Sequence, residues 1–189
     1  VGATALREFG AEIFTVELVS ISFLREFGVL LTAILIAGRS GSAFTAQIGS
    51  MKSREELDAI QALGLDAIEL LVIPRLLALF VMLPLLTFIA MMMGIVGGGI
   101  VGTLALDITP GMFISRVQEM TGVEHFWVGM VKAPVFAFLI ATVGCLEGFK
   151  VEGSAESVGR HTTASVVQSI FLVIVFDSLF AMFFMEMDM

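Results

Sequence analysis

The stretch GRSGSAFTAQIGSMKSREELDAIQALG, from Gly38 to Gly64, changes character halfway along. Its first part is nearly uncharged apart from Arg39, and its second part is dense in carboxylates. Small residues recur every four positions in two sets: Gly38, Ser42, Ala46 and Ser50, and Ala37, Gly41, Thr45 and Gly49. Helices in a bilayer associate through close backbone approach, which needs small residues. The stretch therefore predicts a closely packed membrane helix followed by a short charged helix outside the membrane.

The composition of the whole chain supports a membrane protein. Of its 189 residues, 58% are hydrophobic and 15% are charged, whereas an average soluble domain is about 45–50% apolar and about 25% charged. The net charge of −8 argues against a nucleic-acid-binding protein, which usually has a basic surface. Cys145 is the only cysteine, so the chain forms neither an internal disulfide nor a cysteine-based metal site.

Four hydrophobic segments are long enough to span a bilayer, for which about 20 helical residues suffice. They are Leu24–Gln47, Val72–Leu104, Phe126–Phe149 and Thr162–Met185, and the mixed segment Val1–Ser22 before them predicts an interfacial helix. Lysine and arginine gather in the connections 49–75 and 150–161, whereas the connection 107–124 has only Arg116. The positive-inside rule places the first two in the cytoplasm. The expected fold is an all-α membrane protein, a polytopic helical bundle with a short cytoplasmic amphipathic helix.

That short helix is expected over Ser53–Leu63. Ser53 followed by Glu56 is a capping-box pattern, in which two hydrogen bonds close the first turn. Acidic residues in the first turn suit the helix dipole, and apolar residues recur on one face. The acidic set is Glu55, Glu56 and Asp58, and the apolar set is Leu57, Ile60 and Leu63. Gly64 is a suitable C-terminal stop.

A second stripe of small residues lies in the second span, at Gly94, Gly98 and Gly102. Together with the small residues Gly38, Gly41, Ser42 and Ala46 of the first span, it predicts a tightly packed bundle with a subunit interface. Packing within one chain only is the alternative.

Several charged residues fall inside or near the spans. Arg25, Glu26 and Lys132 all lie towards the non-cytoplasmic ends of their helices, so they are able to meet. A charge at the centre of a span costs about 2.5–3.5 kcal/mol, and such residues usually pair or line a polar cavity. Two interpretations follow. In the first, the charges form a structural ion pair or snorkel to the headgroups. In the second, they line a cavity that holds a polar head between apolar walls. Arg39 lies deeper, and we expect it to bond a carbonyl of another helix or Asp177.

The chain lacks the sequence motifs of the common enzyme classes. It contains no phosphate-binding loop with its lysine, no H-E-x-x-H and no G-x-S-x-G. Its only two histidines, His125 and His161, fall on opposite sides of the predicted membrane. We therefore expect no catalytic residue, no metal site and no cofactor in this chain. If it moves a solute against a gradient, the energy comes from another subunit or an ion.

Several separated blocks resemble the MlaE/YrbE family of ABC-transporter permeases. They are LREFGVLLTAILIAGRSGSAFTAQIGSMKSREELDAIQALGLDAIELLVIPRLLAL, LPLLT, VKAPVFAF, GCLEGFKVEGSAESVGRHTTASVVQS and the late Asp177, in the family's order. The resemblance covers nearly the whole chain and implies a single permease domain over 1–189. The family's N-terminal interfacial helix and most of its first span are expected to be absent here. Val29 stands where the family commonly has proline.

The resemblance implies an inner-membrane permease that forms a homodimer and moves phospholipid between the inner and outer membranes. It implies a cytoplasmic ATPase that binds ATP and Mg²⁺, a periplasmic hexameric ring of MCE-domain subunits and, in many systems, a small STAS-domain protein. Arg25, Glu26, Lys132 and Arg39 would belong to the lipid cavity. Ser53–Leu63 would be the coupling helix, with its apolar face docked in a groove of the ATPase.

Two other functions remain open from the residues alone. One is an ion-coupled secondary transporter of a hydrophobic solute, using Glu26, Lys132 and Asp177. The other is a membrane scaffold that holds lipid-binding subunits without transporting lipid itself.

Overall fold

The computed structural model describes residues 12–105 and 108–187, and every regular element in these ranges is helical. The elements are α2 (Glu12–Ser22), the π-helical turn η1 (Phe23–Phe27), α3 (Gly28–Ile36), the π-helical turn η2 (Ala37–Gly41), α4 (Ser42–Ser53), α5 (Glu56–Ala62), the π-helical turn η3 (Ile68–Val72), α6 (Ile73–Ala105), α7 (Pro110–Met120), α8 (Val123–Phe149) and α9 (Ala155–Glu186).

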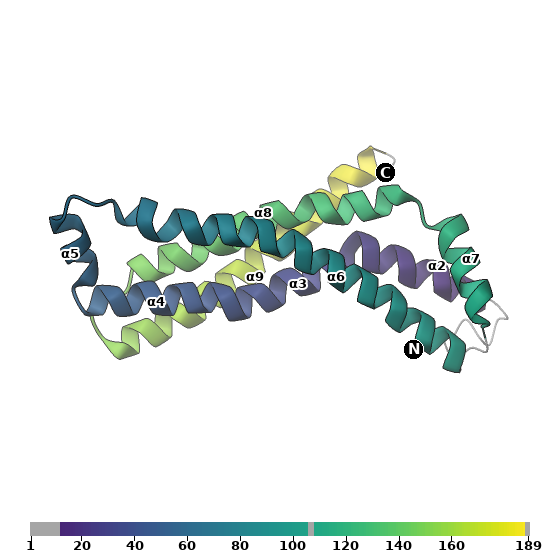
Figure 1. Cartoon of the computed structure of the whole chain (residues 1–189), viewed down its shortest axis with the longest axis horizontal. Helices are drawn as coiled ribbons and strands as arrows, with labels where there is room; N and C mark the ends of the chain where they lie inside the picture. The colour runs from purple at the N-terminus through teal and green to yellow at the C-terminus, as the bar shows by residue number, and fades with distance from the viewer. Residues whose placement is uncertain (1–11, 106–107, 188–189) are drawn as a thin grey trace.

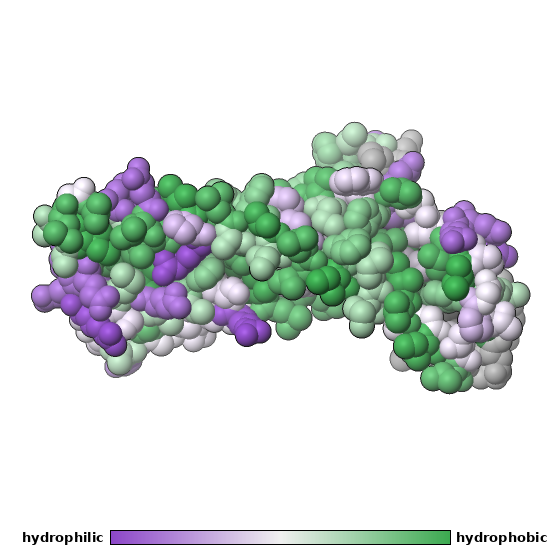
Figure 2. Space-filling view, in the orientation of Figure 1, coloured by the Kyte–Doolittle hydropathy of each residue, from purple (hydrophilic) through white to green (hydrophobic). Residues whose placement is uncertain are grey.

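Four helical stretches in the described residues are long and apolar enough to cross a membrane. They are Val16–Ser53, Ile68–Leu104, Val123–Phe149 and Ala155–Glu186. They run lengthwise through the molecule (Figure 1). Figure 2 shows a broad hydrophobic zone around the middle, with hydrophilic residues gathered towards the two ends. The predicted all-α polytopic fold is confirmed, and the chain is a multi-pass membrane protein.

The first span starts earlier than its hydropathy alone predicts. We expected an interfacial helix up to Ser22 and a span from Leu24, but α2, η1, α3, η2 and α4 follow one another without a break. The physical reason is packing against α6. Val16 is buried, and a Cβ on Gly98 would lie 2.6 Å from Val19 Cγ1. Residues 1–11 of the expected interfacial helix lie outside the described residues.

Helix α8 is the centre of the bundle. Its most apolar stretch is 61% buried, against 33%, 22% and 11% for the other three spans. Val29 and Ala33 from α3, Leu83 from α6 and Val173 from α9 join Phe136 of α8 in the largest core cluster. Because each of the other spans contributes to this cluster, α8 fixes their relative positions.

The small residues of the first span pack directly on α8. A Cβ on Gly144 would lie 2.9 Å from the carbonyl oxygen of Gly41, and the Thr45 hydroxyl donates a 2.8 Å hydrogen bond to the carbonyl of Gly144. On α6, a Cβ on Gly94 would collide with the ring of Phe23. Glycine at these positions permits the backbone approach that holds membrane helices together.

The two stripes of small residues in the first span have different surroundings. Ala37, Gly41, Thr45 and Gly49 are all buried within the chain. In the other stripe, Gly38 is exposed, and a Cβ on it would meet no atom within 4 Å beyond the backbone of its own helix; Ser42 and Ala46 are half-buried. Of the six residues predicted for packing or dimerisation, Gly41, Gly94 and Gly98 therefore pack inside this chain, and Gly38 does not.

The predicted capping box at Ser53 is wrong. Ser53 is the last residue of α4, and its hydroxyl donates to the carbonyl of Gly49 at 2.9 Å. The chain reverses at Glu55, which adopts a left-handed conformation (φ 61°), and α5 begins at Glu56. The reason is tertiary, because α4 continues along α8 to the point where Lys52 Nζ donates to the carbonyl of Phe149 at 2.5 Å.

The C-terminal stop of α5 is as predicted. Gly64 has φ +75°, its N–H donates to the carbonyl of Gln61 at 2.9 Å, and the N–H of Leu65 donates to that of Ile60 at 3.2 Å. These two bonds form a Schellman motif, which needs a residue at positive φ and is normally built with glycine.

The connection that we expected to be a hairpin between Asp107 and Glu124 contains helix α7. Pro110 is its first residue, a position where the missing N–H costs nothing. Asp107 itself lies outside the described residues.

Candidate functional site

A cluster of charged side chains lies inside the bundle, where η1, α8 and α9 meet. Lys132 Nζ is 2.6 Å from Glu26 Oε2 and 3.0 Å from Asp177 Oδ1, and it donates to the carbonyl of Arg25 at 3.3 Å. The Lys132 side chain is 0% exposed. An ammonium group has three donors, and each has an acceptor here, so the buried cation is fully hydrogen-bonded.

Backbone geometry brings these residues together. In the π-helical turn η1 the charged neighbours Arg25 and Glu26 sit beside α8, and such turns are frequent at functional sites. A Cβ on Gly129 would collide with the carbonyl oxygen of Leu24. Glycine at 129 therefore lets η1 lie directly on α8, one turn before Lys132.

The cluster lies within the membrane-spanning helices rather than at their ends. Lys132 is nine residues from the first residue of α8, and Asp177 is nine residues from the last residue of α9. At about 1.5 Å per residue, each lies about 14 Å from that helix end. Both ends point to the α7 side of the bundle (Figure 1), so the charges share one depth.

The charged residues that surround the buried Lys132 ammonium are partly exposed. The side chains of Arg25 and Glu26 are 21% and 31% exposed, and Arg25 Nε lies 3.8 Å from Glu26 Oε1. An exposed apolar stripe starts next to them, formed by Phe27, Leu31 and Leu35. These three residues are spaced by four, so they share one helix face. The arrangement offers charges for a polar group and an apolar surface that leads away from it.

The structure separates Arg39 from this cluster. Its side chain is exposed, and no ion pair or hydrogen bond to it is found among the described residues. Of the two partners that we expected for it, a carbonyl of another helix or Asp177, the second is held by Lys132 instead. We predicted Asp177 to lie in a span but did not include it in the cavity set. Its acidic character within an apolar helix was the available signal.

A second polar cluster closes the opposite end of α8. The carboxylate of Glu147, which is nearly buried, contacts Lys150 Nζ at 2.6 Å and His161 Nδ1 at 2.7 Å. We had not predicted a site at these residues. They tie the end of α8 to the start of α9, which indicates a structural role.

The short helix α5 presents a different face from the one that we predicted. Leu57 is 5% exposed and packs with Ile48 and Cys145, and Ile60 lies against the same cluster. Leu63 lies beyond the helix and is 76% exposed. The apolar face of α5 therefore packs on its own bundle, and the exposed face carries the acids Glu55, Glu56 and Asp58.

Both connections that are rich in lysine and arginine lie at this end of the bundle, as the contact between Lys52 and Phe149 shows. Residues 12–105 and 108–187 contain no group of three or more His, Cys, Asp or Glu side chains that is able to hold a metal ion.

Comparison with known proteins identifies the family. The family model described as Permease MlaE matches residues 1–183. A probable ABC transporter permease protein of Synechocystis is 38% identical over 167 residues, which cover 88% of this chain and 64% of that protein. The intermembrane phospholipid transport system permease protein MlaE of Haemophilus influenzae is 33% identical over 177 residues, which cover 93% of this chain and 68% of that protein.

A probable ABC transporter permease protein of Rickettsia bellii is 33% identical over 183 residues, which cover 97% of this chain and 71% of that protein. The chain thus spans about two thirds of the length of these relatives. A match over almost the whole chain, on a bundle of four spans with an intramembrane charge cluster, shows that this chain belongs to the MlaE permease family of ABC transporters.

Proposed function

We propose that this chain is the inner-membrane permease subunit of an ATP-driven transporter that moves phospholipid between the inner and outer membranes. The observation that carries the proposal is the Lys132 cluster, placed within the spans and continued by the exposed stripe Phe27, Leu31 and Leu35. A phospholipid has the matching form, a charged headgroup on apolar tails. The Haemophilus relative, whose name includes phospholipid transport, supports the substrate class.

The exposure of the cluster suggests a division of roles. Lys132 is sealed and has its three donors occupied, whereas Arg25 and Glu26 have exposed parts. We propose that Arg25 attracts the headgroup phosphate and that Glu26 accepts from an amine or hydroxyl on the same headgroup. Lys132 would hold Glu26 in position. Arg39, further along the exposed side of the helix, would contact the lipid or a second copy rather than this cluster.

The energy source and assembly belong to the same proposal. The family consists of ABC-transporter permeases, so ATP and Mg²⁺ would bind to a separate cytoplasmic ATPase. The region around α5 would contact that subunit. Exposed Gly38 and half-buried Ser42 and Ala46 leave a small-residue surface for a homodimer partner. A periplasmic hexameric MCE-domain ring and a small STAS-domain protein would complete the complex.

Reconstitution with the ATPase and the MCE protein in liposomes tests this function. Labelled phospholipid should move only when ATP is present and hydrolysed. Lys132→Ala should reduce the phospholipid that co-purifies with the complex, because Glu26 loses the cation that positions it. Lipid recovery equal to that of the unaltered protein would remove Lys132 from the lipid site.

One observation also favours a second function. Glu26 and Asp177 share a buried lysine, and ionisable groups of this kind inside a membrane are used in proton relays. An ion-coupled transporter would move its solute in liposomes that contain neither ATPase nor ATP. A scaffold would hold its partners and show no lipid movement under either condition.

A further inference from the structure

A groove runs along the end of α6 that lies beside α7. Five residues of α6 between Ile95 and Thr103 line it, together with Pro110, Phe113 and Ile114 of α7. Its volume is about 390 Å³. None of the charged residues of the Lys132 cluster contributes to its lining, so the groove is separate from the site described above.

The packing of α7 on α6 gives the groove its shape. The Phe113 ring is buried in a cluster with Val16 of α2 and Ile108. It fits where α6 has no side chain, because a Cβ on Gly99 would lie 3.2 Å from Phe113 Cε1. The buried ring fixes α7 against α6, so the groove is formed before a ligand binds. A preformed site loses less conformational entropy on binding.

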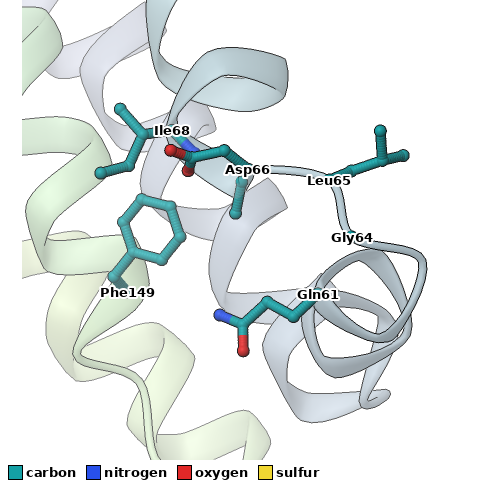
Figure 3. Close-up of a pocket in the computed structure, with 7 residues that line it drawn as sticks. Gln61, Gly64, Leu65, Asp66, Ile68 and Phe149 are labelled. Atoms are coloured by element: carbon teal, nitrogen blue, oxygen red, sulfur yellow. The ribbon is translucent and has the colours of Figure 1, made fainter.

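The lining is apolar and provides no polar contact. Thr103 is the only lining residue with a polar side chain, and its hydroxyl donates to the carbonyl of Ile100 in its own helix at 2.9 Å. Figure 3 shows a contrasting hollow beside α5, where the Asp66 carboxylate and the Gln61 amide lie among the lining side chains. Protein interfaces carry about one hydrogen bond per 100–200 Å². The groove between α6 and α7 therefore suits a hydrocarbon chain better than a protein surface.

An exposed apolar ridge leads from the groove towards the middle of the span. Ile100, Val96, Met92 and Phe88 are all exposed, and their spacing of four places them on one face of α6. The first two line the groove, and the other two continue along the helix. Figure 2 shows hydrophobic residues along α6 as far as its end beside α7. Because this helix spans a bilayer, the surface that leads out of the groove faces lipid.

The groove is too small for a helix of a partner protein. A helix with its side chains is about 10–12 Å across and rises about 5.4 Å per turn, so one turn occupies roughly 400–600 Å³. The groove has a volume of about 390 Å³, which is less than a single turn. An unbranched hydrocarbon chain is thinner than a helix and is able to lie lengthwise along the ridge.

Helix α7 provides a suitable place for a lipid headgroup. Its residues Phe113 and Ile114 face the groove, whereas Gln118 and Glu119 are exposed polar residues. Arg116 is the only lysine or arginine between positions 107 and 124, and it makes no ion pair with any residue that the structure describes. Amphipathic helices with basic residues lie at the boundary between headgroups and acyl chains. The charge of Arg116 is therefore available to a lipid phosphate.

We propose that the groove between α6 and α7 holds one acyl chain of a bilayer phospholipid from the leaflet on the α7 side, with its phosphate beside Arg116. This lipid is a resident component that covers Val96 and Ile100 and holds α7 against α6. The inference goes beyond the proposed function, because it requires only that α6 spans the membrane. The protein would keep this lipid whether or not it transports others.

Two tryptophan substitutions test the groove. Val96 lines it and is 52% exposed, whereas Val101 is 56% exposed on the same helix and does not line it. The full-length protein, with any subunits that co-purify, is washed in detergent and given phosphatidylglycerol with a diazirine on one acyl chain. After photolysis, mass spectrometry should map adducts to residues 95–103 or 110–114. Val96→Trp fills the groove, and excluding about two methylene groups would weaken the lipid about tenfold. Val101→Trp should leave these adducts unchanged.

A second probe tests the phosphate contact. A diacylglycerol with the same photo-reactive chain has no phosphate, so it should label the groove less than phosphatidylglycerol does. Arg116→Gln should remove this difference, because glutamine has no charge to attract a phosphate. Equal labelling of the unaltered protein by the two probes would overturn the assignment of a phospholipid, and so would a preference that Arg116→Gln leaves intact.

The remaining outcomes are equally decisive. Absence of adducts at the groove, equal labelling of Val96→Trp and the unaltered protein, or an equal loss in Val101→Trp would each overturn the site. Labelling that appears only after co-purified subunits are stripped away would show that a protein covers the groove. Adducts along residues 27–35 report on the lipid site of the proposed function. Their absence would count against that function and leave the groove standing.

Discussion

Lys132 Nζ and Glu26 Oε2 lie 2.6 Å apart, although 106 positions separate the two residues in the sequence. The lysine side chain is 0% exposed and the glutamate 31% exposed. The pair therefore has an inner member that is sealed from its surroundings and an outer member at the edge of the bundle. This asymmetry means that the two residues are expected to respond differently to substitution.

Lys132→Met should destabilise the protein strongly. Methionine keeps an unbranched stem but leaves Glu26 and Asp177 without their shared cation. Breaking a buried pair from one side typically costs about 3–5 kcal/mol. Thermal unfolding of the purified protein in detergent measures the loss. Adding Asp177→Asn to the same variant should recover part of it, and a double variant no more stable than the single one would contradict the electrostatic explanation.

Gly144→Ala should destabilise the protein, whereas Gly38→Ala should not, although both add the same methyl group. A Cβ at 144 would lie 2.9 Å from the carbonyl oxygen of Gly41, whereas a Cβ at 38 would meet nothing within 4 Å beyond the backbone of its own helix. The first must push η2 away from α8. The second adds no clash within the chain, so the stability of the monomer should stay the same or rise by up to about 1 kcal/mol through helix propensity. The melting temperatures of the two variants, compared in one detergent, test the prediction, and equal values would refute it.

Thr45→Val should weaken the contact between α4 and α8. The Thr45 hydroxyl donates to the carbonyl of Gly144 at 2.8 Å, across to another helix. Hydrogen bonds between membrane helices average about 0.6 kcal/mol, so a loss of this order is expected in an unfolding experiment. Thr163→Val is the control, because that hydroxyl bonds only to Gly159 within its own helix. A larger loss of stability for Thr163→Val than for Thr45→Val would show that the hydrogen bond between α4 and α8 does not contribute more than one within a helix.

Leu57→Asp should damage the fold, whereas Leu63→Asp should spare it. Leu57 is 5% exposed in a cluster with Ile48, and Leu63 is 76% exposed. A carboxylate at 57 loses its water without gaining a partner. Yield and melting temperature should fall for Leu57→Asp only, and Leu63→Asp should keep both while binding the ATPase less well. A stable, well-folded Leu57→Asp protein would show that α5 is not anchored through this face.

Cysteine labelling should place the two ends of the bundle on opposite sides of the membrane. Glu55→Cys lies beside α5 and Ser115→Cys on α7, and both positions are exposed. A membrane-impermeant maleimide added to intact cells whose outer membrane is permeable should label position 115 and not 55. In inverted vesicles the pattern should reverse. Labelling of position 55 from outside would invert the orientation and remove α5 from the reach of any cytoplasmic subunit.

The sequence by itself determined the class of fold. Apolar segments of sufficient length require helices in a bilayer, because unpaired backbone groups are not tolerated there. Small residues at intervals of four in the first span indicated close helix contacts, and Gly41 and Thr45 make them. The sequence also predicted that Glu26 and Lys132 would lie close together, because a charged side chain inside a span usually pairs with another polar group.

Only the tertiary structure decided which charged side chains pair inside the bundle and which local patterns are kept. Asp177 joined Lys132 and Arg39 did not, because the approach of η1 to α8 at Gly129 and the placement of α9 set those distances. The capping pattern at Ser53 was overridden because α4 gains contacts with α8 by continuing to that residue. The face of α5 was likewise settled by packing, since Leu57 is buried against neighbours that lie far away in the sequence. A local sequence pattern indicates which kind of interaction a residue requires. Long-range packing determines which neighbouring residue provides that interaction.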